Sequence, residues 1–453
     1  MTEPFTTELA STDNASVPPT EFVEPADVSI PVSELIGTGT ALVSPTAFGG
    51  PSATVIVRAG HVQPLWAGHP WVFQQAIERI EGVAPPGADV LVVDPNGKVL
   101  GRGLYSPRSA ISVRLFTPRG GQPIDAALLR VRIEQALALR RAAFLPNATP
   151  EHETTGYRLI HGEGDGLPGL IVDVFDDVLV VQLGTIGLKL REQEVVAGLV
   201  DVLHPRAILD RTPRALATSE GFDPEGPELR AIHGEIPDAL RFHELGIRYE
   251  VPIALAQKTG FYFDQRPLRA YLETVSRGAT VLDTFCYVGA IGLAAARGGA
   301  AQVLGVDKSV PVVLAAAQNA ERNGFSAVVE YEELDANQAF KRTAARGGVD
   351  IVVCDPPKLA SGRKARDNAL GAYRKLAAGA VAAVKPGGLL VFCSCSGSVG
   401  PDALQRALAL GARDSQRRAI VIERLFQGAD HPVAAAFPEG AYLKVLVARI
   451  YEL

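Results

Sequence analysis

The feature that most constrains the fold is a regular alternation of short apolar runs with helix-forming segments, from about residue 255 to the end of the chain. The runs that predict strands are Thr280–Thr284, Gln302–Val306, Val328–Tyr331, Asp350–Cys354, Gly388–Cys393, Ile420–Leu425 and Tyr442–Ile450. Alternation of this kind is typical of a doubly wound, Rossmann-like α/β fold with a parallel sheet. Such sheets bind ligands beyond the carboxyl ends of their strands. The polar residues at those ends are therefore the first candidates for a functional site.

Three strand ends carry acidic residues suited to a nucleoside. The first strand contains Asp283, and the turn after it contains Phe285 and Gly289, where glycine allows a ligand to approach the backbone ahead of a helix. The dinucleotide-binding pattern is only half present there, so this turn alone fits a methyltransferase, a nicotinamide enzyme or a structural turn. Asp307 ends the next strand, where both enzyme classes use a carboxylate to bind ribose hydroxyls. Asp335, after the third strand, is a candidate acceptor for an adenine amino group.

The sequence Asp355-Pro356-Pro357-Lys358 follows the fourth strand and separates these classes. Two prolines fix the backbone and remove two N–H donors, which leaves rigid carbonyl groups beside a cofactor. A hydride-transfer domain has no need of such a turn, so the motif favours a methyltransferase. Enzymes that methylate exocyclic amines often place an aromatic residue after the prolines. Lys358 occupies that position and argues mildly against amine chemistry.

Ser394-Cys395-Ser396 follows the fifth strand, which places Cys395 nearer the ligand edge than Cys393. Carbon 5 of a pyrimidine is a poor nucleophile. Addition of a thiolate to carbon 6 would make it reactive enough to attack a sulfonium methyl group. The alternative is that both cysteines are core thiols, since free cysteines are usually buried. The residues alone leave both interpretations open.

The preceding residues divide into three segments. Residues 1–52 contain seven acidic residues and no Lys or Arg, and predict a disordered acidic tail. Residues 53–120 predict a small β-domain, in which Arg102, Arg108 and Arg114 either face water or bind RNA. Its expected strands are Ala53–Arg58, Asp89–Val93, Val99–Tyr105 and Ser109–Phe116. Residues 121–250 predict a middle α/β domain that opens with a helix at Asp125–Phe144, and residues 251–453 form the catalytic domain.

Composition excludes several classes of protein. No apolar run approaches the ~20 residues that span a bilayer, and the N-terminus lacks the pattern of a secretory signal. Four cysteines in 453 residues do not make a disulfide framework. The net charge of −6 becomes +1 without the acidic tail, so charge neither supports nor excludes RNA binding. We expect a cytoplasmic protein with reduced thiols and no metal.

Longer motifs extend over most of the chain, from about Val55 to Leu453. They are His69–Phe73, Gly101–Pro107, Gly162–Leu170, Gln257–Arg266, Asp355–Lys358, Ser394–Ser396, Ala429–Pro432 and Pro438–Lys444. In these motifs the chain strongly resembles the bacterial large-subunit ribosomal RNA cytosine-C5 methyltransferase family. That family joins an N-terminal PUA domain, a middle α/β domain and a class I methyltransferase domain.

The resemblance implies a role for each candidate residue. Cys395 is the implied nucleophile, with Asp355 as the second catalytic residue. The positions implied for S-adenosyl-L-methionine are Asp283, Phe285, Gly289, Asp307, Asp335, Asp355 and Pro356, with Gln265 and Arg266 on a segment that closes over it. The residues expected to contact ribosomal RNA are Arg102, Arg108, Arg114 and Lys358.

The chain differs from this family at a few positions, and two other functions are possible. The family usually has a second glycine at the position of Ala290, and residues other than cysteine at Cys286, Cys354 and Cys393. A guanine-N methyltransferase on a similar Asp-Pro-Pro domain would explain every feature except a reactive Cys395. A non-catalytic PUA-type RNA-binding factor would not need the intact acids at 283, 307, 335 and 355.

Overall fold

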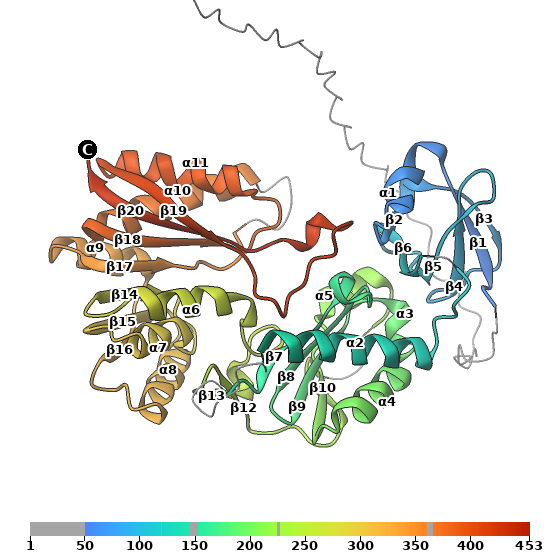
Figure 1. The fold of residues 1–453 in the computed structure, drawn as a ribbon, viewed down its shortest axis with the longest axis horizontal. Helices are drawn as coiled ribbons and strands as arrows, with labels where there is room; N and C mark the ends of the chain where they lie inside the picture. The colour runs from blue at the N-terminus through green and yellow to red at the C-terminus, as the bar shows by residue number, and fades with distance from the viewer. Residues whose placement is uncertain (1–49, 119, 145–152, 224–226, 360–365) are drawn as a thin grey trace, which may run out of the picture. The chain divides into compact units, whose positions relative to one another are not determined.

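The computed structural model describes residues 50–118, 120–144, 153–223, 227–359 and 366–453 (Figure 1). Most of the predicted acidic tail therefore lies outside the described residues. The described part contains sheets of six, five, two and seven strands. None of its helices combines the length and apolarity needed to cross a membrane.

The N-terminal β-domain is one six-stranded sheet in the order β2-β6-β5-β4-β1-β3. Its strands are β1 Ala53–Val57, β2 Trp71–Phe73, β3 Ile77–Gly82, β4 Asp89–Val93, β5 Val99–Tyr105 and β6 Ile111–Thr117, with one helix, α1 Val62–Trp66. The β4–β5 turn is closed by Asp94, whose side chain accepts hydrogen bonds from the Asn96 and Lys98 N–H groups, both at 2.8 Å. Valines of several strands, including Val55, Val90 and Val113, fill its core.

The middle domain is a five-stranded sheet in the order β11-β10-β9-β8-β7 with helices packed on it. Its strands are β7 Gly156–His161, β8 Leu170–Phe175, β9 Val178–Leu183, β10 Ala207–Asp210 and β11 Arg230–His233. The helices are α2 Ala126–Phe144, α3 Ile186–Lys189, α4 Glu192–Leu203 and α5 Arg214–Glu220. Ile133 of α2 and Leu199 of α4 share one core with Val172 and Val181 of the sheet.

The hairpin of β12 Ala239–Glu244 and β13 Ile247–Pro252 connects the middle domain to the catalytic domain. Phe242 and Tyr249 on it belong to the same apolar core as Leu268 of the catalytic domain and Phe175 of the middle sheet. The boundary expected near residue 250 thus lies inside a continuous core.

The catalytic domain is a seven-stranded sheet in the order β16-β15-β14-β17-β18-β20-β19, in which β20 pairs antiparallel to both of its neighbours, β18 and β19, and the other pairs are parallel. The strands are β14 Thr280–Thr284, β15 Gln302–Asp307, β16 Val329–Glu333, β17 Val349–Cys354, β18 Val384–Ser394, β19 Arg417–Leu425 and β20 Lys444–Glu452. The helices are α6 Arg266–Val275, α7 Ala290–Arg297, α8 Val310–Arg322, α9 Ala336–Ala345, α10 Arg366–Ala382 and α11 Pro401–Asp414. The predicted doubly wound Rossmann-like fold is confirmed.

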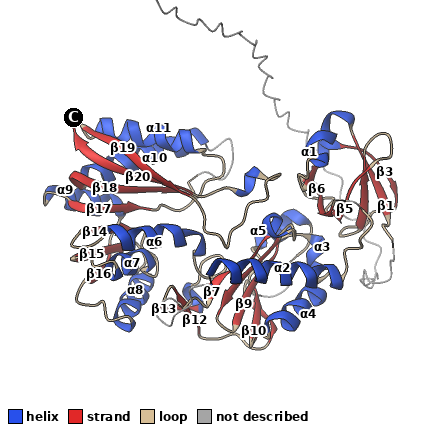
Figure 2. Ribbon diagram, viewed as in Figure 1, coloured by secondary structure: helices blue, strands red, loops and turns tan. Residues whose placement is uncertain are grey.

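Successive residues of each strand point to opposite faces of this sheet, and both faces are buried. Val281 and Val353 face the core shared with α6, α7 and α8, whereas Leu282 and Val352 face the core shared with α9, α10 and α11. Figure 2 shows α10 and α11 on one side of the sheet and α6, α7 and α8 on the other. This burial explains why the strands read as continuous apolar runs in the sequence.

Residues 426–443, which we name the C-terminal loop, leave β19 and return at β20. Asp430 of this loop accepts hydrogen bonds from Arg140 and from the Arg158 N–H in the middle domain, at 2.8 and 3.2 Å. Phe437 packs on Trp71 of the β-domain with ring centroids 4.6 Å apart. The loop therefore contacts both other domains.

Candidate active site

The turn between β14 and α7 has a backbone shape suited to a bound ligand. Phe285, Tyr287 and Gly289 all have positive φ, at 63°, 50° and 86°. Non-glycine residues adopt this conformation only where the surroundings impose it, as at ligand sites. At position 289 a Cβ would lie 2.3 Å from the Tyr331 hydroxyl, so only glycine fits there. The turn thus holds a left-handed, closely packed backbone at the carboxyl end of the sheet.

Asp283 lies fully buried below this turn. One carboxylate oxygen accepts the Gly292 N–H at 3.1 Å, and the other has no partner among the described residues. Burial and the neighbouring Asp355 hold the pKa of Asp283 well above its usual range. A buried acceptor without a donor is rare in folded proteins and suits a ligand that supplies one.

Asp307 and Asp335 differ in the partners of their carboxylate groups. Asp307 is half-buried at the end of β15, where its two oxygens accept the Tyr287 and Ser309 N–H groups, both at 3.2 Å. Asp335 instead caps α9 through the Asn337 N–H at 2.9 Å and pairs with Lys308 at 2.7 Å. This ion pair lowers the pKa of Asp335. Contact of Asp335 with adenine stays a prediction.

The Asp-Pro-Pro turn directly follows β17, at the same edge of the sheet. Asp355 Oδ2 accepts a hydrogen bond from Gln265 Nε2 at 2.9 Å. Burial, with a further contribution from the carboxylate of Asp264, raises the pKa of Asp355 to about 7. Pro356 is buried, whereas Lys358 is exposed. Asp355 therefore holds a proton part of the time near neutral pH.

Cys395 follows β18 and is held by both of its neighbours. The Tyr373 hydroxyl of α10 bridges Ser394 Oγ at 2.9 Å and Ser396 Oγ at 3.1 Å. Lys444 Nζ donates to the Ser396 carbonyl at 2.7 Å. These contacts fix the backbone on both sides of the thiol.

The two thiols at this strand end differ in access. Cys395 is half-buried, and Cys393 is fully buried. Burial raises the pKa of both thiols, and at Cys395 the Lys258 ammonium opposes part of that rise. Of these two thiols, Cys395 is therefore the one that is partly exposed.

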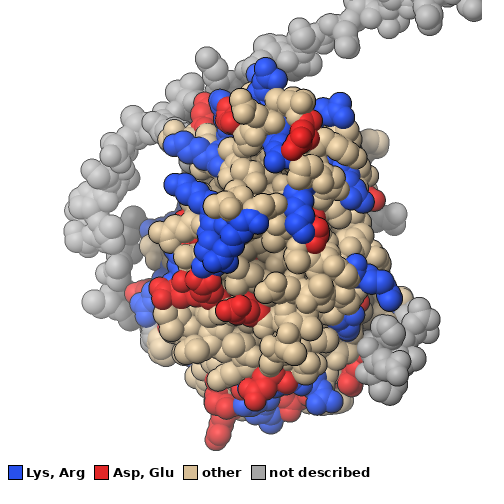
Figure 3. Space-filling model, turned by 90° about the vertical axis from the view of Figure 1, so that its left-hand side faces the viewer, with Lys and Arg blue, Asp and Glu red and all other residues tan. Residues whose placement is uncertain are grey.

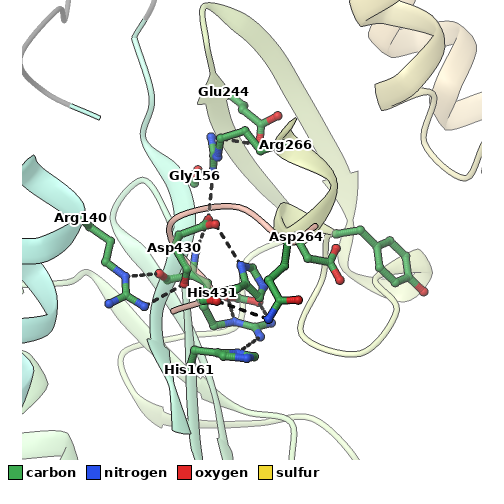
Figure 4. A network of polar contacts seen from close by, with 12 residues as sticks. Arg140, Gly156, His161, Glu244, Asp264, Arg266, Asp430 and His431 are labelled. Atoms are coloured by element: carbon green, nitrogen blue, oxygen red, sulfur yellow. Dashed lines mark hydrogen bonds and ion pairs between the residues drawn. The ribbon is translucent and has the colours of Figure 1, made fainter. Parts of the chain in front are cut away.

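Arg266 requires a correction. Its guanidinium is buried and pairs with Glu244 and with Asp430, both at 3.1 Å, and it donates to the Gly156 carbonyl at 3.0 Å (Figure 4). It therefore links the domains instead of closing over the cofactor, and only Gln265 of the pair reaches Asp355.

Two of the three arginines predicted to bind RNA also require correction. Arg102 is 3% exposed and pairs with Asp89 at 2.6 Å. Arg114 is 8% exposed and pairs with Glu220 of α5 at 2.9 Å. Both guanidinium groups are buried in ion pairs within the protein, whereas the Arg108 side chain is exposed. Figure 3 shows that Lys and Arg also gather on the left-hand side of the view in Figure 1, with Asp and Glu beside them.

Sequence reasoning assigned no role to three residues that shape the site. Tyr373 lies on a helix and belongs to no motif. Asp264 and Lys444 were within motifs, but nothing in the sequence distinguished them from structural residues. Among the described residues, no group of three or more His, Cys, Asp or Glu is arranged to hold a metal ion.

Comparisons with known proteins agree with this architecture. Residues 55–118 match the PUA-like domain family, and residues 157–449 match the S-adenosylmethionine-dependent methyltransferase family. The ribosomal RNA large subunit methyltransferase I of Shewanella denitrificans is 37% identical over 399 residues, covering 87% of this chain and 98% of that protein. The protein of the same name from Pseudoalteromonas translucida is 36% identical, covering 88% and 100%.

Solved structures show the same fold. A methyltransferase complexed with SAH superimposes with a TM-score of 0.74 at 20% identity, covering 87% of this chain and 99% of the other. An S-adenosylmethionine-dependent methyltransferase from Streptococcus mutans gives a TM-score of 0.73 at 19% identity, over the same shares. The unpaired oxygen of Asp283, the tight turn at Gly289 and the carboxylate of Asp307 fit such a cofactor. The chain belongs to the S-adenosylmethionine-dependent methyltransferase family, and S-adenosylmethionine is its cofactor.

Proposed function

We propose that this protein methylates carbon 5 of a cytosine in large-subunit ribosomal RNA through a covalent adduct with Cys395. The relatives named above support the substrate class. The observation that carries the chemistry is the half-buried thiol of Cys395, fixed at the cofactor edge beside Asp355. When bound, S-adenosylmethionine supplies an electrophilic methyl group.

Cys395 acts as the nucleophile in this proposal. Its thiolate adds to carbon 6 of the cytosine, and the resulting electron density makes carbon 5 able to attack the methyl group. Solvent then takes the proton of carbon 5, and the proton that Asp355 places on nitrogen 3 returns to Asp355, so that the thiolate leaves and the aromatic ring is restored. The contacts of Tyr373 and Lys444 with the flanking serines hold the sulfur in place through both steps. The target base must leave its stack to reach the thiol.

Asp355 serves as the proton donor for the addition step. Its pKa of about 7 keeps a fraction protonated at neutral pH, as general acid catalysis requires. A proton given to nitrogen 3 of the cytosine draws electrons from carbon 6 and favours attack by the thiolate. Gln265 fixes the carboxyl through its hydrogen bond to Oδ2.

The rival guanine-N methyltransferase would use the same Asp-Pro-Pro turn but has no need of a thiol. The support that Tyr373 and Lys444 give to the serines around Cys395 favours the cytosine reaction. The non-catalytic RNA-binding factor is disfavoured because the chain belongs to a methyltransferase family and keeps the acids around the Gly289 turn. We further propose that the PUA-like domain binds RNA, with Arg108 as its exposed cation and Lys358 as a cation near the site.

Mass spectrometry of ribosomal RNA nucleosides tests this function. Large-subunit RNA from cells that lack the gene should lose one 5-methylcytosine, and the purified enzyme with S-adenosylmethionine should restore it. Restoration of a methylguanine instead would establish the rival reaction.

A further inference from the structure

Asp264 lies in the short turn Phe263–Gln265 and is 6% exposed. Its Oδ2 accepts a hydrogen bond from the Tyr442 hydroxyl at 2.6 Å, and its Oδ1 has no donor among the described residues. The nearby Arg158 and Arg269 bind other acids, Asp173 and Glu244. Buried carboxylate oxygens normally find donors, because an unpaired one is unfavourable. Oδ1 therefore lacks a donor among the described residues and can accept one from a bound molecule.

Hydrogen bonds connect Asp264 to the reacting groups. Tyr442, which donates to Asp264, accepts at its carbonyl a hydrogen bond from Lys444 Nζ at 2.7 Å. The same ammonium holds the Ser396 carbonyl, next to Cys395. On the other side, Gln265, the residue after Asp264, donates to Asp355. The carboxylate of Asp264 also raises the pKa of both Asp355 and Cys395.

The C-terminal loop also fixes the backbone of Asp264. The Asp264 carbonyl accepts the Gly428 N–H at 3.2 Å, and Figure 4 shows Asp264 at the border of the buried network around Arg266 and Asp430. Asp264 is thus fixed on its backbone and on Oδ2. A carboxylate fixed in this way presents its remaining oxygen in one direction. Such an oxygen is suited to accept a hydrogen bond from one particular donor of a bound molecule.

The pairing edge of cytosine distinguishes it from uracil by two adjacent groups. Cytosine has an acceptor at nitrogen 3 and an amino donor at carbon 4, and uracil has the reverse. If Asp355 donates to nitrogen 3, the amino group beside it requires an acceptor. Carboxylates are the side chains that accept from this amino group.

We propose that Asp264 selects cytosine over uracil by accepting a hydrogen bond at Oδ1 from the amino group of the target base. This inference rests on the proposed function. It names a specificity-determining residue for that reaction, with Asp355 reading nitrogen 3 and Asp264 reading the amino group. The other candidate donor for Oδ1 is the amino group of the cofactor, and the experiment distinguishes the two.

The test begins by mapping the nucleotide that the wild-type enzyme methylates in RNA from the deletion strain. Two transcripts of that region, with cytosine or uracil at the target, are then assayed for kcat/KM with wild-type enzyme and with Asp264→Asn. The variant keeps the size of the side chain but presents an N–H to the base. Its preference for cytosine over uracil should fall by about 100-fold. Asp414→Asn, the same substitution at an exposed aspartate of α11 that pairs with Arg374, is the matched control and should keep the preference.

Several results would overturn the inference. One is a folded Asp264→Asn enzyme with the wild-type preference for cytosine. Another is a loss of S-adenosylmethionine affinity by calorimetry with the preference retained, which would direct Oδ1 to the cofactor. If the asparagine variant does not fold, Asp264→Ala gives the same comparison, and the preference should again fall. A wild-type product other than 5-methylcytosine would overturn the proposed function itself, and is seen before any variant is made.

Discussion

Replacing Asp355 by asparagine should stabilise the free protein while it removes activity. Burial disfavours the ionised carboxylate, so the native state holds its proton up to a pKa of about 7, compared with 3.8 for an unperturbed aspartate. Below both values the carboxyl is protonated in both the folded and the unfolded chain. As the pH rises toward 7, the unfolded chain loses the proton first, so stability falls; above 7 the loss is constant.

The magnitude follows from this difference in pKa. Each pKa unit corresponds to about 1.4 kcal/mol, so ionisation of Asp355 costs up to about 4 kcal/mol of folding free energy above pH 7. Asparagine is neutral and still accepts the Gln265 hydrogen bond. Asp355→Asn should therefore unfold with a free energy higher by up to about 4 kcal/mol at pH 8.5 but by only about 2 kcal/mol at pH 5.5.

Urea denaturation at the two pH values measures this directly, and methyl transfer is assayed in parallel. Turnover should fall by about 100-fold or more, because asparagine cannot give a proton to nitrogen 3. A variant that is equally or less stable than the wild type at pH 8.5 would refute the raised pKa. A stabilised variant with normal turnover would refute the role of Asp355 as proton donor.

Three further predictions concern the cofactor, the β-domain and the tail. Asp307→Ala should weaken S-adenosylmethionine binding about 10- to 150-fold by calorimetry, and unchanged affinity would exclude Asp307 from the site. Arg114→Ala should lower the free energy of unfolding by about 3–5 kcal/mol, because it leaves Glu220 buried without a partner. Arg108→Ala should instead keep stability and lower the salt dependence of RNA binding by about one phosphate contact; equal effects of the two changes would contradict this division. Deletion of residues 1–52 should leave turnover within about twofold, and a larger loss would give the tail a role with the substrate.

Strands with continuous or alternating apolar residues were predictable from the sequence. β4, β5 and β14 match the predicted bounds because their valines and leucines set the pattern. β2 has three residues, and β3 carries charged side chains. β7 contains Arg158, whose charge is compensated by Asp173 on β8. Such compensation arises from the tertiary fold, so the local pattern did not reveal these strands.

The strand-end acids were also predictable, because their places follow from the order of a parallel sheet. The ion-pair partners of the arginines were not predictable from the sequence. Arg114 pairs with a residue 106 positions later, and Arg266 with one 164 positions later. An arginine on a short strand has the same local sequence whether it faces RNA or a buried carboxylate. The contacts of Tyr373, Lys444 and Asp264 likewise depend on elements that only the fold brings together.

The most direct test of the proposed reaction is adduct trapping. RNA with 5-fluorocytosine at the target should form a covalent complex with the wild-type enzyme and S-adenosylmethionine, because fluorine cannot leave carbon 5 as a proton does. Cys395→Ala should abolish both the adduct and turnover while it retains cofactor binding, and Cys393→Ala should keep both. An active Cys395→Ala enzyme, or an adduct lost only in Cys393→Ala, would contradict catalysis by Cys395.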